Sequence, residues 1–123
     1  MSPTARTLKW IRDAGYHAQV VETWVPQTSQ RRDLFGVIDI VAVDGTTTLG
    51  IQATSTANVA ARVQKCLSHD GAKQWLACPT RQLWVVGWRR YAHPLDGRWW
   101  RPTIRRIARS DLALAPTAQG EQG

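Results

Sequence analysis

The sequence predicts one α/β domain, with a mixed central sheet flanked by helices. Three observations predict this class. Apolar residues recur at helical spacing between Ala5 and Ala14. The runs 34–43 and 82–88 are almost wholly apolar, which suits strands covered on both faces. A helical segment from Asn58 lies between two strand segments, which implies a crossover connection. We place the domain at residues 1–112 and expect a disordered tail at 113–123.

The first elements follow from caps and turn residues. Ser2 is expected to cap a helix that carries Pro3 in its first turn and ends at Gly15. Residues 17–25 are β-rich, and the polar residues 27–32 show no periodicity, which predicts a strand followed by a loop. The segment from Leu34 to Val43 is expected to be one continuous strand.

The remaining elements complete the sheet. Asp44-Gly45 predicts a two-residue hairpin turn, with residues 46–54 as the returning strand. Asn58 is expected to cap a second helix with a buried stripe of Val59, Val63 and Leu67. A short helical segment at 72–77 and strands at 82–88 and 99–108 follow. The order is helix, three strands, helix, two strands.

The charge of the chain points to a polyanionic partner. Lys and Arg number 16 against 9 Asp and Glu, a net charge of +7. Thirteen of these cations are Arg, whose planar group donates two hydrogen bonds to one phosphate. We therefore expect DNA or RNA binding, with DNA first.

Other features exclude several classes of protein. No apolar run reaches the ~20 residues that cross a bilayer, so no membrane association is expected. Cys66 and Cys78 do not form a CxxC pair, and the three His residues lack zinc-site spacing. We expect reduced thiols in a cytoplasmic protein.

Asp39 conflicts with its apolar surroundings, because an unpaired buried carboxylate is costly. A two-residue turn at Asp44-Gly45 would pair Asp39 with Gly50 and place it on the sheet face of Gln52 and Thr54. Gly50 would leave space opposite Asp39. Three polar groups on one face of apolar strands predict a site.

This pattern resembles the PD-(D/E)XK nuclease superfamily. The residues that carry the resemblance are DLFGVIDIVAVDG, LGIQATS and NVAARVQK, with Asp39 on one strand and Gln52-x-Thr54 on the next. The resemblance covers about residues 4–90 and is strongest to small Holliday junction resolvases and phage-type nucleases. It implies a restriction-endonuclease-like αβββαβ core and a Mg²⁺- or Mn²⁺-dependent DNA endonuclease, active on branched DNA among other substrates. It also implies the cytoplasm of a bacterium or a phage-infected host.

The resemblance also implies residue roles. Asp39 is the main metal ligand, Gln52 takes the second ligand position, and the Ala53 carbonyl completes the shell. Thr54 occupies the position of the catalytic Lys. Because Thr54 carries no charge, Arg62 or Lys65 on the following helix is expected to replace that Lys.

Further candidates come from the acidic and basic residues nearby. Glu22, on a partly covered strand face, is a candidate third carboxylate for the metal. Asp33 has the parity of Asp39, but a continuous strand puts it about 20 Å away. It is expected to pair with Arg31 or Arg32, or to cap the loop. The expected nucleic-acid contacts are Arg31, Arg32, Arg62, Arg105 and Arg106.

Two other functions stay open. One is a nucleic-acid-binding module on the same fold that has lost catalysis. The other is a protein-interaction domain whose Trp residues form the contact. A homodimer fits the two-fold symmetry of junction substrates, and the basic residues from Trp99 to Arg109 would contact DNA or form the dimer interface.

Overall fold

The centre of the protein is a mixed five-stranded sheet with the order β1-β4-β5-β6-β7. A computed structural model describes residues 1–114. The strands are β1 (His17–Val20), β4 (Ile40–Val43), β5 (Thr48–Ser55), β6 (Arg81–Leu95) and β7 (Arg98–Ile107). Strands β5 and β6 are parallel, and the other neighbours are antiparallel. A separate two-stranded ribbon pairs β2 (Thr23–Val25) with β3 (Gln30–Arg32).

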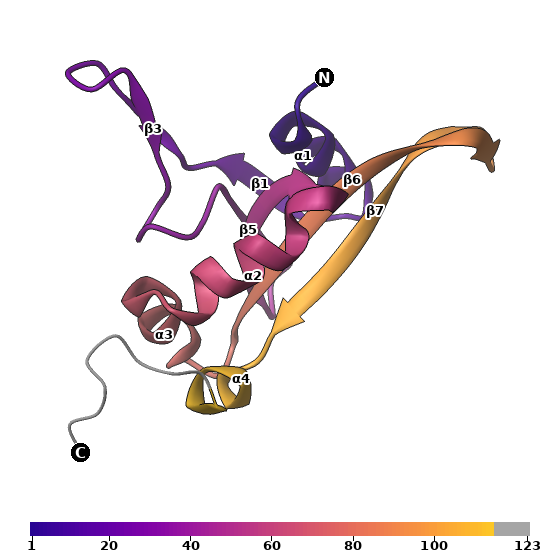
Figure 1. The fold of residues 1–123 in the computed structure, drawn as a ribbon. Coiled ribbons are helices and arrows are strands. Elements are labelled where there is room, and N and C mark those ends of the chain that lie inside the picture. The colour runs from indigo at the N-terminus through magenta and orange to yellow at the C-terminus, as the bar shows by residue number, and fades with distance from the viewer. Residues whose placement is uncertain (115–123) are drawn as a thin grey trace.

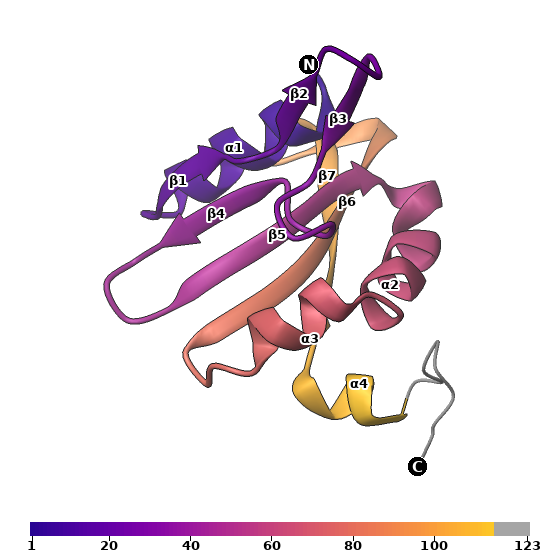
Figure 2. The ribbon, with the colours of Figure 1, turned by 90° about the vertical axis from the view of Figure 1, so that its left-hand side faces the viewer.

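Helices cover both faces of the sheet, which confirms the mixed α/β class (Figures 1 and 2). The helix α1 (Pro3–Asp13) lies on one face, and α2 (Val59–Leu67) and α3 (Asp70–Leu76) lie on the other. A 3₁₀ turn η1 (Thr56–Asn58) precedes α2, and α4 (Arg109–Leu114) follows β7. The segment η1–α2–α3 is the predicted crossover between the parallel strands β5 and β6.

The hydrophobic core has one layer on each side of the sheet. Ile40, Ala42 and Ile51 belong to the layer under α1, together with Ile11 of that helix. Val63 and Cys66 of α2 belong to the other layer. Alternation along a strand therefore assigns odd-numbered residues of β4 and even-numbered residues of β5 to the α2 face.

The predicted start and end of α1 are confirmed. Ser2 is the N-cap, and its hydroxyl accepts a hydrogen bond from the Ala5 amide at 3.1 Å. Pro3 is the first helical residue, where its missing N–H costs nothing. Gly15 follows the helix with φ +101°, a conformation that favours glycine.

The region before β4 differs from the prediction. Residues 17–25 form two strands, β1 and β2, which belong to different sheets, and the expected loop at 27–32 contains β3. The predicted domain boundary at 112 falls within α4. The end of the expected disordered tail, 115–123, lies outside the described residues.

The continuous strand expected at 34–43 is wrong, because only Ile40–Val43 are strand. Residues 34–38 form a tight turn closed by reciprocal hydrogen bonds between Leu34 and Ile38, with N···O distances of 2.8 and 3.0 Å. Phe35 and Gly36 adopt φ +52° and +80° in this turn. A Cβ at position 36 would also lie 2.4 Å from the His69 ring, so the tight turn requires glycine there.

The two-residue turn expected at Asp44-Gly45 is also wrong, because Val43 pairs with Thr48. The Asp44 carboxylate accepts hydrogen bonds from the amides of Thr46 and Thr47 at 3.0 and 2.9 Å, which holds a four-residue loop. Gly50 faces Val41 rather than Asp39. The space above Gly50 is filled by Ile38 and Trp75.

The sheet face predicted for Asp39 is nevertheless correct. The register differs from the predicted one by two residues, and an even shift leaves every side chain on its face. Asp39, Gln52 and Thr54 thus share the face covered by α2. A search of the described helices finds none that is both long and apolar enough to span a membrane.

Candidate functional site

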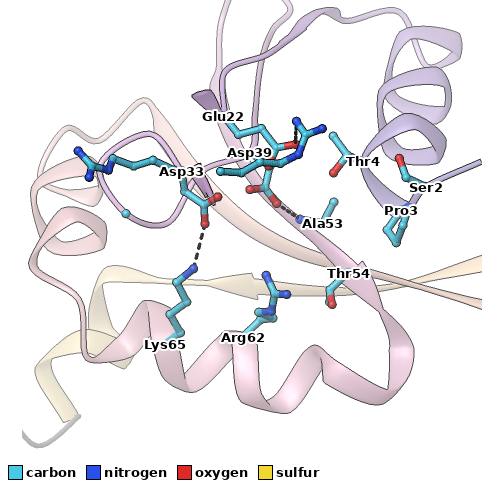
Figure 3. Close-up of a pocket in the computed structure, with 13 residues that line it drawn as sticks. Ser2, Pro3, Thr4, Glu22, Asp33, Asp39, Ala53, Thr54, Arg62 and Lys65 are labelled. Atoms are coloured by element: carbon cyan, nitrogen blue, oxygen red, sulfur yellow. Dashed lines mark hydrogen bonds and ion pairs between the residues drawn. The ribbon is translucent and has the colours of Figure 1, made fainter. Parts of the chain in front are cut away.

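Three carboxylates gather at the edge of the sheet where β5 ends (Figure 3). Glu22 lies between β1 and β2, Asp33 directly follows β3, and Asp39 directly precedes β4. One carboxylate oxygen from each lies within 4.8 Å of those of the other two. The cluster therefore joins the ends of three separate strands.

Asp33 reaches this cluster through the turn at 34–38. The expected separation of about 20 Å from Asp39 is wrong, because the turn folds the chain back instead of extending it. The expected pairing of Asp33 with Arg31 or Arg32 is replaced by an ion pair with Lys65, whose Nζ lies 2.9 Å from Asp33 Oδ2. Gly36, within an otherwise apolar run, was the sequence signal for the break.

Asp39 is the most buried of the three, with 4% of its surface exposed. One of its oxygens accepts a hydrogen bond from the Ala53 amide at 2.8 Å. Burial, together with the neighbouring carboxyl groups of Asp33 and Glu22, raises the pKa of Asp39 to about 8, although the Ala53 amide opposes this shift. At neutral pH Asp39 is therefore largely protonated when no cation lies beside it.

The pKa of Asp33 shifts in the opposite direction to that of Asp39. Burial tends to raise its pKa, but hydrogen bonds to Asp39, Lys65 and Gln52 outweigh that effect and the pKa is lowered. The two aspartates thus hold one proton between them, on Asp39. Like charges this close do not both ionise easily without a compensating cation.

Two cationic side chains face the carboxylates from α2. Arg62 and Lys65 lie three residues apart and so share one side of the helix. Arg62 Nη1 donates to the side-chain oxygen of Gln52 at 2.6 Å, and Lys65 Nζ lies 3.5 Å from the same oxygen. Both residues expected as replacements for the missing catalytic Lys therefore reach the site.

Gln52 is fully buried and links the acidic and basic groups. Its side-chain nitrogen donates to the Val37 carbonyl at 2.8 Å and to Asp33 at 3.1 Å. Its oxygen accepts from Arg62, so it does not face the carboxylates as the second metal ligand that the sequence predicts. The group that takes a place near Asp39 is Asp33.

Some of the other predicted site residues line the pocket that holds the carboxylates, and some lie elsewhere. Thr54, 4% exposed, and Ala53 line the same pocket of about 680 Å³ as the carboxylates. The structure gives Ala53 a contact to Asp39 through its N–H, whereas the expected ligand was its carbonyl. Arg31 and Arg32 also line this pocket, and Arg31 Nη1 lies 3.5 Å from Glu22.

Arg105 and Arg106 lie elsewhere, on β7, and are both exposed. Successive residues of a strand point to opposite faces, so these two arginines do not form one surface. The Arg106 guanidinium lies 4.7 Å from the ring centre of Trp84 on the α1 face. Neither arginine lines the carboxylate pocket.

Sequence reasoning also missed the N-terminal wall of the pocket. Ser2, Pro3 and Thr4, in the first turn of α1, line it opposite α2 (Figure 3). Their proximity results from α1 crossing the sheet with its N-terminus toward the end of β5. No local sequence signal indicated this contact.

The pocket is thus built from carboxylates on strand ends, cations on α2 and the first turn of α1. Its three clustered acids have the oxygen donors that Mg²⁺ and Mn²⁺ prefer. The sequence matches no protein-family profile, and neither a curated protein nor a solved structure matches the chain.

Proposed function

We propose that this protein is a metal-dependent DNA endonuclease whose cation is held by Glu22, Asp33 and Asp39. The observation that carries the proposal is the approach of three carboxylate oxygens to within 4.8 Å, next to the cations of α2. A divalent cation would stabilise the ionised form of Asp39, which burial and the carboxyl groups of Asp33 and Glu22 disfavour. The donor set consists of hard oxygen ligands, which fits Mg²⁺ or Mn²⁺.

The topology supports the resemblance to PD-(D/E)XK nucleases. Taking β2–β3 as an insertion, the chain runs α1, β1, β4, β5, α2 and β6, which is the αβββαβ order that the resemblance implies. Asp39 directly precedes β4, and Gln52-x-Thr54 lies near the end of β5. The function and the family are proposed together on this basis.

The protein's own residues have distinct roles in this proposal. A bound divalent cation would polarise the scissile phosphate and lower the pKa of the attacking water. Lys65 forms an ion pair with Asp33 at 2.9 Å and is the cation that takes over the role of the Lys missing at Thr54. Arg62 is fixed on Gln52, and Arg31 and Arg32 contact phosphates at the mouth of the pocket.

The test is cleavage of plasmid, single-stranded and four-way-junction DNA with Mg²⁺ and with Mn²⁺. We expect cleavage by the wild type with metal, none in EDTA, and none by Asp39→Asn or Asp33→Asn. The matched control is Asp70→Asn, because Asp70 is an exposed aspartate on α3 outside the pocket. Equal cleavage by Asp39→Asn and wild type would overturn the assignment.

One observation favours a second function, a nucleic-acid-binding module without cleavage. The oxygen of Gln52 is engaged by Arg62 at 2.6 Å, so the second ligand position of the motif supplies no anion, and Thr54 does not supply the motif's cation. Under this alternative the wild type binds DNA and metal, yet every substrate remains intact with both cations. Absence of nucleic-acid binding at low salt would instead favour the protein-interaction domain.

A further inference from the structure

The strands β6 and β7 extend beyond the rest of the sheet as a two-stranded ribbon (Figure 1). The last pair between β5 and β6 is Ser55 with Trp88, so residues 89–95 pair only with β7. Isolated two-stranded ribbons are marginally stable in water. The segment 89–101, which forms this ribbon, carries four arginines, three aromatic residues and a single acid, Asp96. This composition suits contact with a polyanion.

Two arginine side chains stack on aromatic rings within the ribbon. The Arg101 guanidinium lies 3.5 Å from the ring centre of Tyr91, and that of Arg90 lies 4.9 Å from Trp99. Such contacts hold cationic groups beside aromatic faces near the surface. Trp99 itself keeps 42% of its surface exposed. A large indole left in solvent on a basic ribbon is available to stack on a ligand.

A groove of about 570 Å³ separates this ribbon from α1. The chemically distinctive residues of its lining are Arg6, Lys9 and Trp10 from α1 and Arg98, Trp99 and Trp100 from the ribbon. Arg6 lies 3.8 Å from the ring centre of Trp100, which fixes both side chains. Asp13 also lines the groove, but it is paired with Lys9 at 2.8 Å. The arginines therefore leave the groove with a positive charge.

The groove and the carboxylate pocket meet at the N-terminus of α1. Ser2, Pro3 and Thr4 line the pocket, while Met1 and Arg6 line the groove. The first turn of α1 thus forms a wall common to both hollows. A linear polymer that occupies the pocket and passes over this turn enters the groove.

We propose that this groove binds single-stranded nucleic acid, with Trp99 stacking on a base and Arg6 and Arg98 contacting phosphates. A single strand exposes base faces to an aromatic side chain, whereas a duplex exposes chiefly its phosphates. This inference rests on the proposed function, and names single-stranded segments as part of its substrate. Binding in the groove requires neither the metal nor the carboxylates.

The experiment measures fluorescence anisotropy of labelled oligo(dT) with the full chain in EDTA, so that no cleavage occurs. Trp99→Leu removes the aromatic face, and we expect at least about fivefold weaker binding. Trp99→Phe should restore most of it, because Phe also stacks. Arg98→Gln should weaken binding and reduce the slope of log affinity against log salt by about 0.7. Lys73→Gln on α3, also exposed, is the charge control.

Two comparisons separate this inference from the proposed nuclease. Asp39→Asn should bind oligo(dT) like the wild type, so loss of cleavage with retained binding contradicts neither proposal. Cleavage-competent protein whose Trp99→Leu and Arg98→Gln variants bind oligo(dT) normally would overturn the groove assignment alone. It would also be overturned if blunt duplex or polyglutamate bound more tightly than oligo(dT) and these substitutions weakened that binding instead. Thermal unfolding of each variant verifies that it is folded.

Discussion

The ammonium group of Lys65 lies 2.9 Å from a carboxylate oxygen of Asp33, although 32 residues separate them in the chain. The contact joins α2 to the turn that follows β3, and it places a cation of α2 directly against the carboxylate cluster (Figure 3). Hydrogen bonds with Asp39, Lys65 and Gln52 lower the pKa of Asp33, whereas burial and the neighbouring Asp33 raise that of Asp39. The charge state of the site therefore depends on the contacts among these groups.

Substitution of Asp39 by Asn should leave the metal-free protein as stable as wild type or more stable. Asn resembles the protonated carboxyl group: its oxygen can accept from the Ala53 amide and its NH₂ can donate to Asp33. In millimolar Mg²⁺ or Mn²⁺ only the wild type should gain stability, with Tm rising about 4 °C per kcal/mol of binding. Thermal unfolding with EDTA and with metal measures both effects.

A different result would identify a structural role for Asp39. If the carboxylate neutralised a buried cation, Asn would leave that cation unpaired and cost about 3–5 kcal/mol. A large fall in Tm for Asp39→Asn, together with a wild type indifferent to metal, would reject the metal site. Asp70→Asn serves as the control for loss of an ordinary surface carboxylate.

The metal-free protein should lose stability as the pH rises from about 4 to about 8. The pKa of Asp39 is about 8 in the folded protein against an ordinary value of 3.8, so the folded state binds a proton that the unfolded chain releases. The free energy of unfolding therefore falls across this interval, and the contribution is lost once the pH passes about 8. The pKa of Asp33 is lowered in the folded protein, so Asp33 affects the free energy of unfolding only below its ordinary pKa of 3.8. In that range its contribution makes stability rise with pH.

Urea unfolding in EDTA between pH 5 and pH 8 measures this slope. Asp39→Asn should flatten it relative to wild type, and saturating Mg²⁺ should flatten it as well. Metal affinity should increase with pH over the same interval, since binding displaces the proton from Asp39. A slope that is identical in wild type and Asp39→Asn would show that other groups produce it.

Much of the architecture was predictable because its signals are local or periodic. Ser2 and Pro3 predict the start of α1. The apolar stripe of Val59, Val63 and Leu67 predicts the buried side of α2, although Leu67 is only half-buried and Cys66 is the third buried residue. The prediction that Asp39, Gln52 and Thr54 share one face is correct although the predicted turn is wrong. The predicted register is off by two residues, and a shift of two leaves each side chain on its face.

The fold near Asp33 was not predictable from periodicity. An apolar run such as LFGVIDIVAV satisfies a buried strand and a buried turn equally well, and only Gly36 distinguishes them. The dipeptide Asp-Gly shows the same limit. At 96–97 both residues have positive φ and form a two-residue turn, whereas at 44–45 only Gly45 does and the side chain of Asp44 holds a longer loop. Long-range contacts decide between such alternatives.

Substitution of Gln52 by Glu should destabilise the protein, although the nuclease motif accepts either Glu or Gln at this position. The Gln52 nitrogen donates to the Val37 carbonyl and to Asp33, and an ionised Glu would place acceptors against both. Stronger pairing with Arg62 offsets only part of that loss. We expect a net cost of about 1–3 kcal/mol in urea unfolding.

The matched control for this substitution is Gln19→Glu, at an exposed position of β1, which should change stability little. Wild-type stability or better for Gln52→Glu in EDTA would show that the side chain is not held by these two donor contacts. Increased metal affinity in that variant would then favour Gln52 as a ligand, as the sequence first indicated.

Substitution of Lys65 by Met should abolish cleavage without weakening metal binding. Lys65 is 39% exposed, so its ion pair with Asp33 contributes at most about 1 kcal/mol to stability, and Tm should change little. Removing its positive charge leaves the carboxylates more attractive to a divalent cation, so metal affinity should stay the same or increase. Loss of a catalytic cation should nevertheless lower the cleavage rate by about 100-fold or more.

Lys65→Arg and Lys73→Met serve as controls for charge at the site and for charge elsewhere on the surface. Calorimetric metal titration and single-turnover cleavage give the two quantities. Reduced metal affinity in proportion to reduced cleavage would show that Lys65 only positions Asp33, and an unchanged cleavage rate would leave Arg62 as the cation that replaces the motif's Lys.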